Sequence, residues 1–176
     1  MKFIIALPIF FLNKKIKYMA KKYWLFKSDP EDFGWDDLKK SKNKRTSWSG
    51  VRNYQVRNFI RDDMKKGDWV LFYHSNAEPN EIKGICEIVK EGYADDTQFK
   101  PDDPHYFPSA SMDEPIWYMV DIQFKEELKK SVTLNDIKKN PKLKNMKLVQ
   151  KGSRLSISPV TKDEYDEIIK MSKSKD

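Results

Sequence analysis

The chain has 176 residues, of which 39% are hydrophobic, 35% charged and 13% aromatic. This length fits one compact domain, and the many Trp, Tyr and Phe residues carry more buriable surface than a disordered chain has. A mean hydropathy of −0.79 and the lack of any run of 18 apolar residues argue against a membrane-spanning helix. The single cysteine, Cys86, excludes a disulfide within the chain, and two histidines supply few soft metal ligands.

The net charge of +7 is unevenly distributed. Residues 1–18 contain four lysines and no acidic residue, which leaves 30 basic and 27 acidic residues in the remainder. The folded part is therefore only mildly basic. Such a balance is compatible with nucleic-acid binding but does not require it, because a strong electrostatic footprint needs a clustered basic patch.

The first 18 residues form an extension with no clear structural role. Residues 3–12 are an apolar run like the core of a signal peptide, but no small-residue cleavage site follows. Met19 stands directly before the first convincing strand. We therefore predict that Met19 is the true start, that residues 1–18 are not part of the domain, and that the protein is cytoplasmic. An uncleaved membrane-surface anchor and export are the alternatives.

The first third of the chain alternates apolar and polar segments. Residues 23–27 are aromatic and apolar and end at a Ser-Asp-Pro turn, which predicts a strand. A short helix is expected over residues 35–40, followed by a polar loop over residues 41–50 that contains Trp48. Residues 51–63 have apolar positions at helical spacing and predict a second helix.

Two strands are expected next, over residues 69–73 and 84–89. Residues 92–115 contain four prolines, which restrict the backbone and remove hydrogen-bond donors, so we predict a long ordered loop. This loop either closes over a ligand pocket as a lid or packs its aromatic side chains on the core from outside. Residues 116–124 alternate well enough for a strand.

Short elements complete the chain. Thr133 and Asp136 have the spacing of a helix start, residues 155–158 predict a last strand, and Thr161 with Glu164 forms a capping-box pattern before a terminal helix. The strands and helices do not alternate in a regular βαβ order. We therefore expect an α+β domain built on a small, mostly antiparallel sheet or barrel.

Known catalytic patterns are missing from the sequence. There is no glycine-rich phosphate loop, zinc signature or nucleophile elbow. The acidic pairs at 95–96 and 102–103 could bind Mg²⁺, but such pairs are more typical of solvated turns. His74 and Ser75 directly follow the strand expected over residues 69–73, and in extended backbone their side chains point to opposite faces, so we do not expect them to form a nucleophilic pair.

Residues 47–59 carry the most informative pattern. An aromatic ring, hydroxyls, arginines and amides gather at a loop-to-helix junction, where backbone N–H groups and arginine forks favour phosphate and an aromatic ring favours a base. Arg52 is expected to point inward in the first turn of the helix. It either binds phosphate or pairs with a buried carboxylate such as Asp121. Trp48 either stacks on a base or belongs to the core.

Seven blocks of this sequence together resemble the EVE domain, a member of the PUA-like superfamily. The blocks are residues 22–30, 48–58, 72–75, 84–89, 93–99, 117–121 and 154–156, and the resemblance covers residues 21–170. It implies a PUA-like fold, a small twisted and mostly antiparallel β-barrel with peripheral helices. It also implies a binding module, because related YTH and ASCH domains bind RNA or modified nucleotides in an aromatic-lined pocket. One departure is Asp29, where the family commonly has Glu.

We therefore predict a nucleic-acid-binding module that reads a modified base of DNA or RNA. Trp48 would stack on the base, and polar groups of Ser28, Asn53 and Ser75 would read the base edge. Arg52 with Arg57 would hold phosphates. The residues expected at the site are Ser28, Trp48, Val51, Arg52, Asn53, Tyr54, Arg57, Tyr73, His74, Ser75, Trp117, Asp121 and Arg154. Tyr73 and Trp117 are expected as further stacking faces.

We expect no catalytic residue, no cofactor, no metal and no membrane span. The alternative is a hydrolase of nucleotides or nucleic acids that uses Asp95, Asp96, Asp121 and His74. The base modification, the choice between DNA and RNA, and the oligomeric state stay open at this point.

Overall fold

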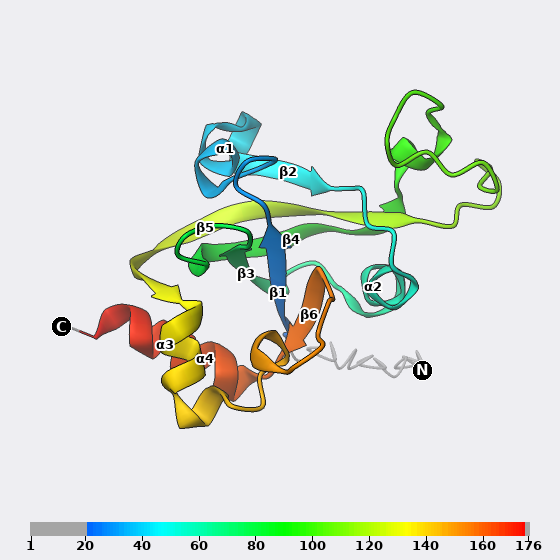
Figure 1. Ribbon diagram of the computed structural model, residues 1–176. Helices are drawn as coiled ribbons and strands as arrows, with labels where there is room; N and C mark the ends of the chain where they lie inside the picture. Colours follow the sequence, from blue (N-terminus) through cyan, green and yellow to red (C-terminus); the bar gives the residue numbers. More distant parts are fainter. Residues whose placement is uncertain (1–20, 175–176) are drawn as a thin grey trace, which may run out of the picture.

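A curved mixed sheet of six strands forms the centre of the molecule (Figure 1). The computed structural model describes residues 21–174, so the prediction for residues 1–18 lies outside the described chain. The strands are β1 (Tyr23–Ser28), β2 (Arg45–Trp48), β3 (Trp69–His74), β4 (Glu81–Ala94), β5 (Tyr118–Thr133) and β6 (Ile157–Val160). Their order in the sheet is β2-β5-β4-β3-β1-β6.

The α-helices of the described chain lie around this sheet. They are α1 (Trp35–Lys40), α2 (Tyr54–Asn58), α3 (Leu134–Lys139) and α4 (Lys162–Lys173). A π-helical turn, η2 (Phe59–Asp63), continues α2. Within residues 21–174, every helix is too short or too polar to cross a bilayer.

The sheet is open. Of the five ladders in residues 21–174, only β1 with β3 is parallel, which confirms the expected α+β class with a mostly antiparallel sheet. No ladder in this part of the chain joins β2 to β6, so the barrel expectation needs correction. A barrel closes where its first and last strands pair. Here both edge strands are only four residues long.

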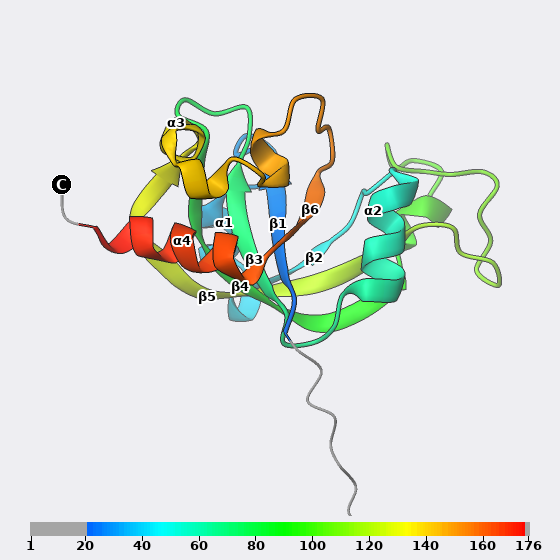
Figure 2. The ribbon, with the colours of Figure 1, turned by 90° about the horizontal axis from the view of Figure 1, so that it is seen from below.

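Alternation along the strands creates one core on each face of the sheet. Neighbouring strand residues point to opposite faces, so Phe26 belongs to the first core and Leu25 to the second. The first core also receives apolar residues of α1, α2 and η2. The second is covered by α3 and α4, which lie together at one end of the molecule in Figure 2.

Several element bounds differ from those expected. The polar loop over 41–50 contains β2, whose exposed and half-buried residues alternate. The helix over 51–63 begins at Tyr54, because the preceding Asn53 has extended backbone and its Oδ1 accepts a hydrogen bond from the N–H of Val56. This cap satisfies one of the free donors at a helix start.

Strands β4 and β5 are longer than their apolar segments indicated. They pair as a bent ribbon of 14 and 16 residues whose register shifts at four places. The first three residues of the expected loop over 92–115 are therefore the end of β4. Most of the rest is irregular, as expected, apart from a short 3₁₀ turn at Asp96–Phe99.

Candidate functional site

A pocket of about 550 Å³ lies on the open side of the sheet. Its walls come from the end of β1 and the following loop, from β2 with the loop that leads to α2, and from the residue before β6. The lining residues are Lys27, Ser28, Asp29, Asp32, Phe33, Thr46, Ser47, Trp48, Ser49, Gly50, Val51, Arg52 and Ser156. Edge strand β2 therefore lines the pocket, and edge strand β6 begins directly after the lining residue Ser156.

Trp48 is both a core residue and a wall of this pocket. Its ring meets Phe26 at a centroid distance of 5.1 Å and Phe72 at 5.7 Å, both edge-on. The side chain is nevertheless only half-buried and lines the pocket. The two sequence alternatives for Trp48 therefore do not exclude each other, because one part of the ring packs in the core and another faces the pocket.

Ser28 fixes the first turn of the pocket wall. Its Oγ donates to the backbone oxygen of Phe33 at 2.6 Å, and its own backbone oxygen accepts from the N–H of Ser75 at 2.8 Å. His74 lies behind this wall, where its Nε2 accepts from the backbone N–H of Trp35 at 3.0 Å. Burial lowers the pKa of His74, which favours the neutral ring that such a contact needs. Ser75 and His74 support the pocket without lining it.

Residues 49–52, in the loop between β2 and α2, form the rim of the pocket. Arg52 lies at the end of this rim and uses all five of its N–H groups inside the protein. Its Nε and one Nη2 hydrogen reach the backbone oxygen of His105, and the other Nη2 hydrogen reaches the hydroxyl of Thr97 at 2.9 Å. Nη1 donates to the backbone oxygen of Val51 and to Asp95. No donor is left for a phosphate, so Arg52 holds the rim in place.

Asp95 is the buried acceptor of this network. Its carboxylate also accepts from the backbone N–H of Gly50 at 2.9 Å and from both N–H and hydroxyl of Thr97. Burial raises the pKa of Asp95, but hydrogen bonds from Thr97, Arg52 and Gly50 outweigh it, and the pKa lies below its ordinary value. Asp95 therefore stays ionised and ties the rim to the loop that follows β4.

The expected partner of Arg52, Asp121, was the wrong carboxylate. Asp121 accepts from Nε of Arg45 at 3.0 Å and from the hydroxyl of Tyr93. Val120 and Ile122 on either side belong to the first core. Asp121 consequently points to the opposite face of the sheet, away from Trp48.

Gly50 allows the rim loop to pass close to the long loop. Its φ is +78°, and a Cβ at this position would lie 2.8 Å from Nε2 of His105. Any other residue would meet both backbone strain and a steric clash. The conformation that places Val51 and Arg52 at the pocket thus depends on this glycine.

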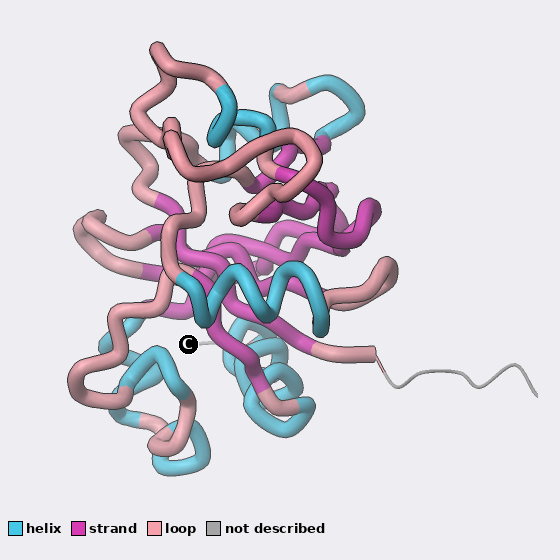
Figure 3. Tube along the Cα trace, turned by 90° about the vertical axis from the view of Figure 1, so that its right-hand side faces the viewer, coloured by secondary structure: helices cyan, strands magenta, loops and turns pink. Residues whose placement is uncertain are grey.

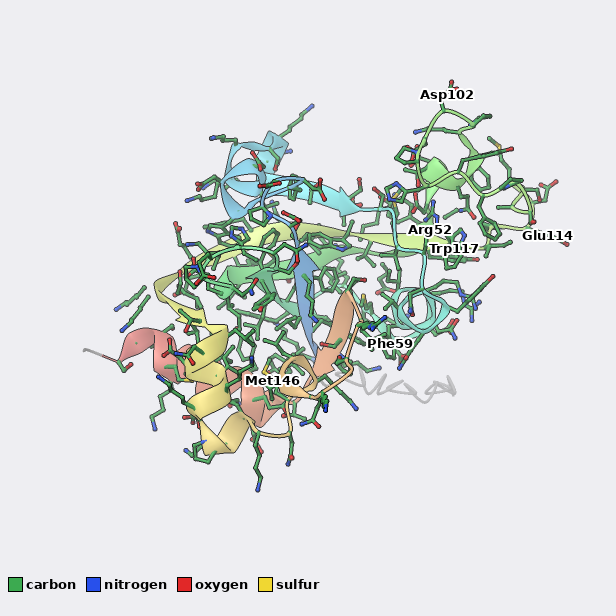
Figure 4. All side chains as sticks on the ribbon, in the orientation of Figure 1. Arg52, Phe59, Asp102, Glu114, Trp117 and Met146 are labelled. Carbon is green, nitrogen blue, oxygen red and sulfur yellow. The ribbon has the colours of Figure 1, made fainter. Side chains whose placement is uncertain are left out.

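Trp117 is a buried platform beside the rim. It is 2% exposed, with the Tyr54 ring tilted against it at a centroid distance of 4.8 Å and Phe107 edge-on at 5.5 Å. The guanidinium of Arg52 lies 5.4 Å from the ring centroid, and Figure 4 shows the two side chains together near α2. This packing leaves no open face for a base, so Trp117 is not a stacking wall of the pocket.

The other expected residues fall into separate places. Tyr73 is buried in the second core, on the far side of the sheet from Trp48. Asn53 caps α2, and Arg154 lies outside the pocket lining, five residues past the end of the last 3₁₀ turn. The expected site residues left out nine residues of the lining, which are Asp29, Asp32, Phe33, Lys27, Thr46, Ser47, Ser49, Gly50 and Ser156. The turn pattern that ends β1 is a signal that could have indicated the first three.

The long loop does not form a lid in this structure. None of residues 95–115, all of them described, lines the pocket. Gln98 holds the loop from inside, because its side chain bonds the backbone of Asp95, Ile116 and Trp117. The loop therefore supports the rim through Asp95 and packs Phe107 on Trp117.

The residues of the hydrolase alternative are not gathered in one site. His74 contacts the backbone of α1, Asp95 holds Arg52, Asp96 pairs with Lys100 at the surface, and Asp121 pairs with Arg45. Within residues 21–174, no three His, Cys, Asp or Glu side chains come close enough together to hold a metal ion. This arrangement does not support a hydrolytic centre.

Known proteins share both the sequence and the fold. Residues 22–171 match the EVE domain. The chain is 42% identical over 166 residues to thymocyte nuclear protein 1 of Homo sapiens, which covers 85% of this chain and 73% of the relative. Its counterpart in Gallus gallus is 43% identical over 180 residues, with 93% and 72% covered.

Solved structures agree with this likeness. Human THYN1 protein, solved in complex with 5-methylcytosine containing DNA, superposes with a TM-score of 0.81 at 40% identity and covers 89% of this chain and 100% of that one. A protein from Leishmania major gives a TM-score of 0.79 at 38% identity, with 86% and 94% covered. The match over most of the chain and the shared fold show that this chain belongs to the EVE domain family.

Proposed function

We propose that this chain is a DNA-binding module that reads a methylated cytosine, extruded from its strand into the pocket beside Trp48. One observation carries the proposal: Trp48, anchored in the core by two aromatic contacts, turns part of its ring to a cavity on the open side of the sheet. An extruded base needs such a pocket and such a stacking face. The human THYN1 structure with 5-methylcytosine containing DNA supports the choice of base.

The lining offers both kinds of contact that a methylated cytosine needs. Phe33 and Val51 supply apolar surface for a methyl group. Asp29 and Asp32 supply carboxylates, which are suitable acceptors for the exocyclic amino group of cytosine. Hydrogen bonds from Asn76 and Glu31 hold the pKa of Asp29 below its usual range, so it is an acceptor at neutral pH.

Four fluorescein-labelled oligonucleotides of one sequence test this proposal, as DNA and RNA with cytosine or 5-methylcytosine at one position. Fluorescence anisotropy at fixed salt gives each Kd. We expect the tightest binding for methylated DNA. Equal affinity for methylated and unmethylated DNA would contradict base reading, and preference for methylated RNA would replace DNA as the partner.

The same oligonucleotides separate a reader from an enzyme. We propose that the chain binds without turnover, because the residues of the hydrolase alternative support the fold in separate places. Incubation with Mg²⁺ or Mn²⁺ should return the oligonucleotide intact on a denaturing gel. Cleavage that increases with protein concentration and is lost in a Trp48→Ala variant would contradict this.

The cellular location expected from the sequence, the cytoplasm, remains a prediction. The relatives are called thymocyte nuclear proteins, so the nucleus is the alternative for a DNA reader. Imaging of the tagged full chain in its own cells decides between the two.

A further inference from the structure

The two arginines of the segment between β2 and η2 differ in their free donors. Arg52 uses all five N–H groups inside the protein. Arg57, five residues later, uses only two, since its Nε and one Nη2 hydrogen both reach Oδ1 of Asn58, at 3.0 and 2.8 Å. Three N–H groups of Arg57 thus have no partner among residues 21–174.

Arg57 is also held in one orientation. Its guanidinium lies 4.9 Å from the ring centroid of Tyr54, and Tyr54 itself packs against the buried Trp117. The Tyr54 ring is 55% exposed, so solvent reaches the side of this pair that faces away from Trp117. A planar guanidinium stacked on a ring and fixed by an amide presents its remaining donors outward as a fork.

Arg57 forms no direct ion pair within residues 21–174, although its charge helps to lower the pKa of the nearby Asp62 carboxyl. Residues 50–61 contain three arginines and no acidic residue. Arg61, one turn further on, does have a counter-ion, because its Nε and Nη2 reach the two carboxylate oxygens of Asp62 at 2.7 and 2.8 Å. Arg57 is therefore the arginine of this segment that has no direct ion pair and keeps three donors free.

We propose that Arg57 binds a backbone phosphate beside the extruded base, and that Tyr54 is its positioning residue. The inference rests on the proposed function and adds the contact that holds the strand. Helix α2 begins two residues after the pocket rim and lies toward the viewer in Figure 3. Tyr54 and Arg57 are three residues apart, about 4.5 Å along the helix, and the proposal places the strand that enters the pocket along this turn.

Anisotropy titrations with duplex DNA carrying one 5-methylcytosine, and with the unmethylated duplex, test the proposal. Arg57→Gln should weaken binding to both duplexes about tenfold, as expected for one charged hydrogen-bonded contact. The slope of log affinity against log salt should become shallower by about 0.9, the value for one phosphate contact on a duplex. Arg61→Gln is the matched control and should change neither quantity by much.

A positioning role for Tyr54 has its own signature. Tyr54→Phe keeps the ring and should bind like the wild type, whereas Tyr54→Leu should weaken binding about threefold, a partial loss of the Arg57 contact. In the Arg57→Gln background, Tyr54→Leu should have no further effect, because nothing is left to position. A thermal melt of each variant shows that the fold is retained.

The outcomes distinguish this inference from the proposed function. If Arg57→Gln behaves like Arg61→Gln while the wild type still prefers methylated DNA, the phosphate contact is wrong and base reading stands. If Arg57→Gln reduces both the affinity and the salt slope but the wild type shows no preference for methylated DNA, the phosphate contact stands and base reading is wrong. Equal losses for Tyr54→Leu in both backgrounds would overturn the positioning role.

Discussion

Asp95 is the residue on which the pocket rim depends most. Its fully buried carboxylate holds Arg52 and the backbone of Gly50, so it links the rim to the loop after β4. Removal of one member of a buried ion pair leaves the other charge uncompensated and typically costs 3–5 kcal/mol. The Asp95 carboxylate therefore stabilises the rim, and because it is buried it is not available to a ligand.

We predict that Asp95→Asn destabilises the protein by about 3 kcal/mol, because Arg52 loses its counter-ion. Asp96→Asn is the matched control, since the neighbouring Asp96 pairs only with Lys100 at the surface, and it should change stability little. Urea denaturation at pH 7 measures both. Equal stability of the two variants would show that the network does not hold the rim.

Acid should weaken the same network. The pKa of Asp95 is lower in the folded protein than its ordinary value, so its contribution to stability is complete above about pH 4 and is lost as the pH falls through the folded pKa. We expect the free energy of unfolding to decrease less steeply below pH 4 in Asp95→Asn than in the wild type. Parallel pH profiles of the two proteins would contradict this.

The long-range partner of Arg52 could not be predicted from the sequence. The motif around Arg52 indicated that its partner is a buried carboxylate or a phosphate. The partner is indeed a buried carboxylate, but it belongs to Asp95, 43 residues away, and not to Asp121, which is further away in the sequence. Local spacing does not determine which distant carboxylate a fold brings near. Strand alternation excludes Asp121 only once the register of β5 with β2 is known.

At the level of elements, the loop between β2 and α2 forms one side of the pocket. Gly50 gives this loop its shape, with a positive φ and the His105 ring in close contact. Gly152 also has a positive φ, but nothing lies within 4 Å of the position of its Cβ. A comparison of substitutions at these two glycines therefore distinguishes the cost of backbone strain, which both share, from the cost of a steric clash, which only Gly50 has.

We predict that Gly50→Ala destabilises the protein more than Gly152→Ala does. Both variants incur the strain of a left-handed backbone, of the order of 1 kcal/mol, but only Gly50→Ala adds the clash with His105. His105→Ala should relieve part of the loss in the Gly50→Ala background. Thermal melts of the four proteins measure this, and equal losses for the two glycine variants would refute the steric argument.

Elements with apolar patterns were predictable, and polar ones were not. The cores of β1, β3 and β4 and the capped start of α4 follow directly from their patterns. Strand β2 was missed because its sequence, Arg-Thr-Ser-Trp, is polar and only its pairing with β5 makes it a strand. Sheet edges are specified by partners rather than by local preference.

On the scale of the whole molecule, the open sheet explains why the pocket exists. A closed barrel would pair β2 with β6 and fill the space that Trp48 borders. The sequence resemblance indicated the correct superfamily, helices and predominantly antiparallel sheet, but not the open edge. Whether a short strand pairs with its neighbour depends on a few backbone hydrogen bonds, which no pattern of side chains reveals.

The proposed function requires that a methylated base stacks on Trp48. The most direct measurement is the ratio of Kd for unmethylated and methylated duplex DNA, compared between the wild type, Trp48→Ala and Phe59→Ala. Phe59 is a matched control, because it is also a half-buried ring against the first core, in contact with the Trp24 ring, but it does not line the pocket. Each variant should lose about 2–3 kcal/mol of stability.

The predicted result is that Trp48→Ala binds methylated DNA with about 1–3 kcal/mol less affinity and no longer distinguishes it from unmethylated DNA. Phe59→Ala should keep the wild-type ratio. If Trp48→Ala retains the wild-type preference for methylated DNA, the base is read elsewhere and the pocket beside Trp48 is not the site.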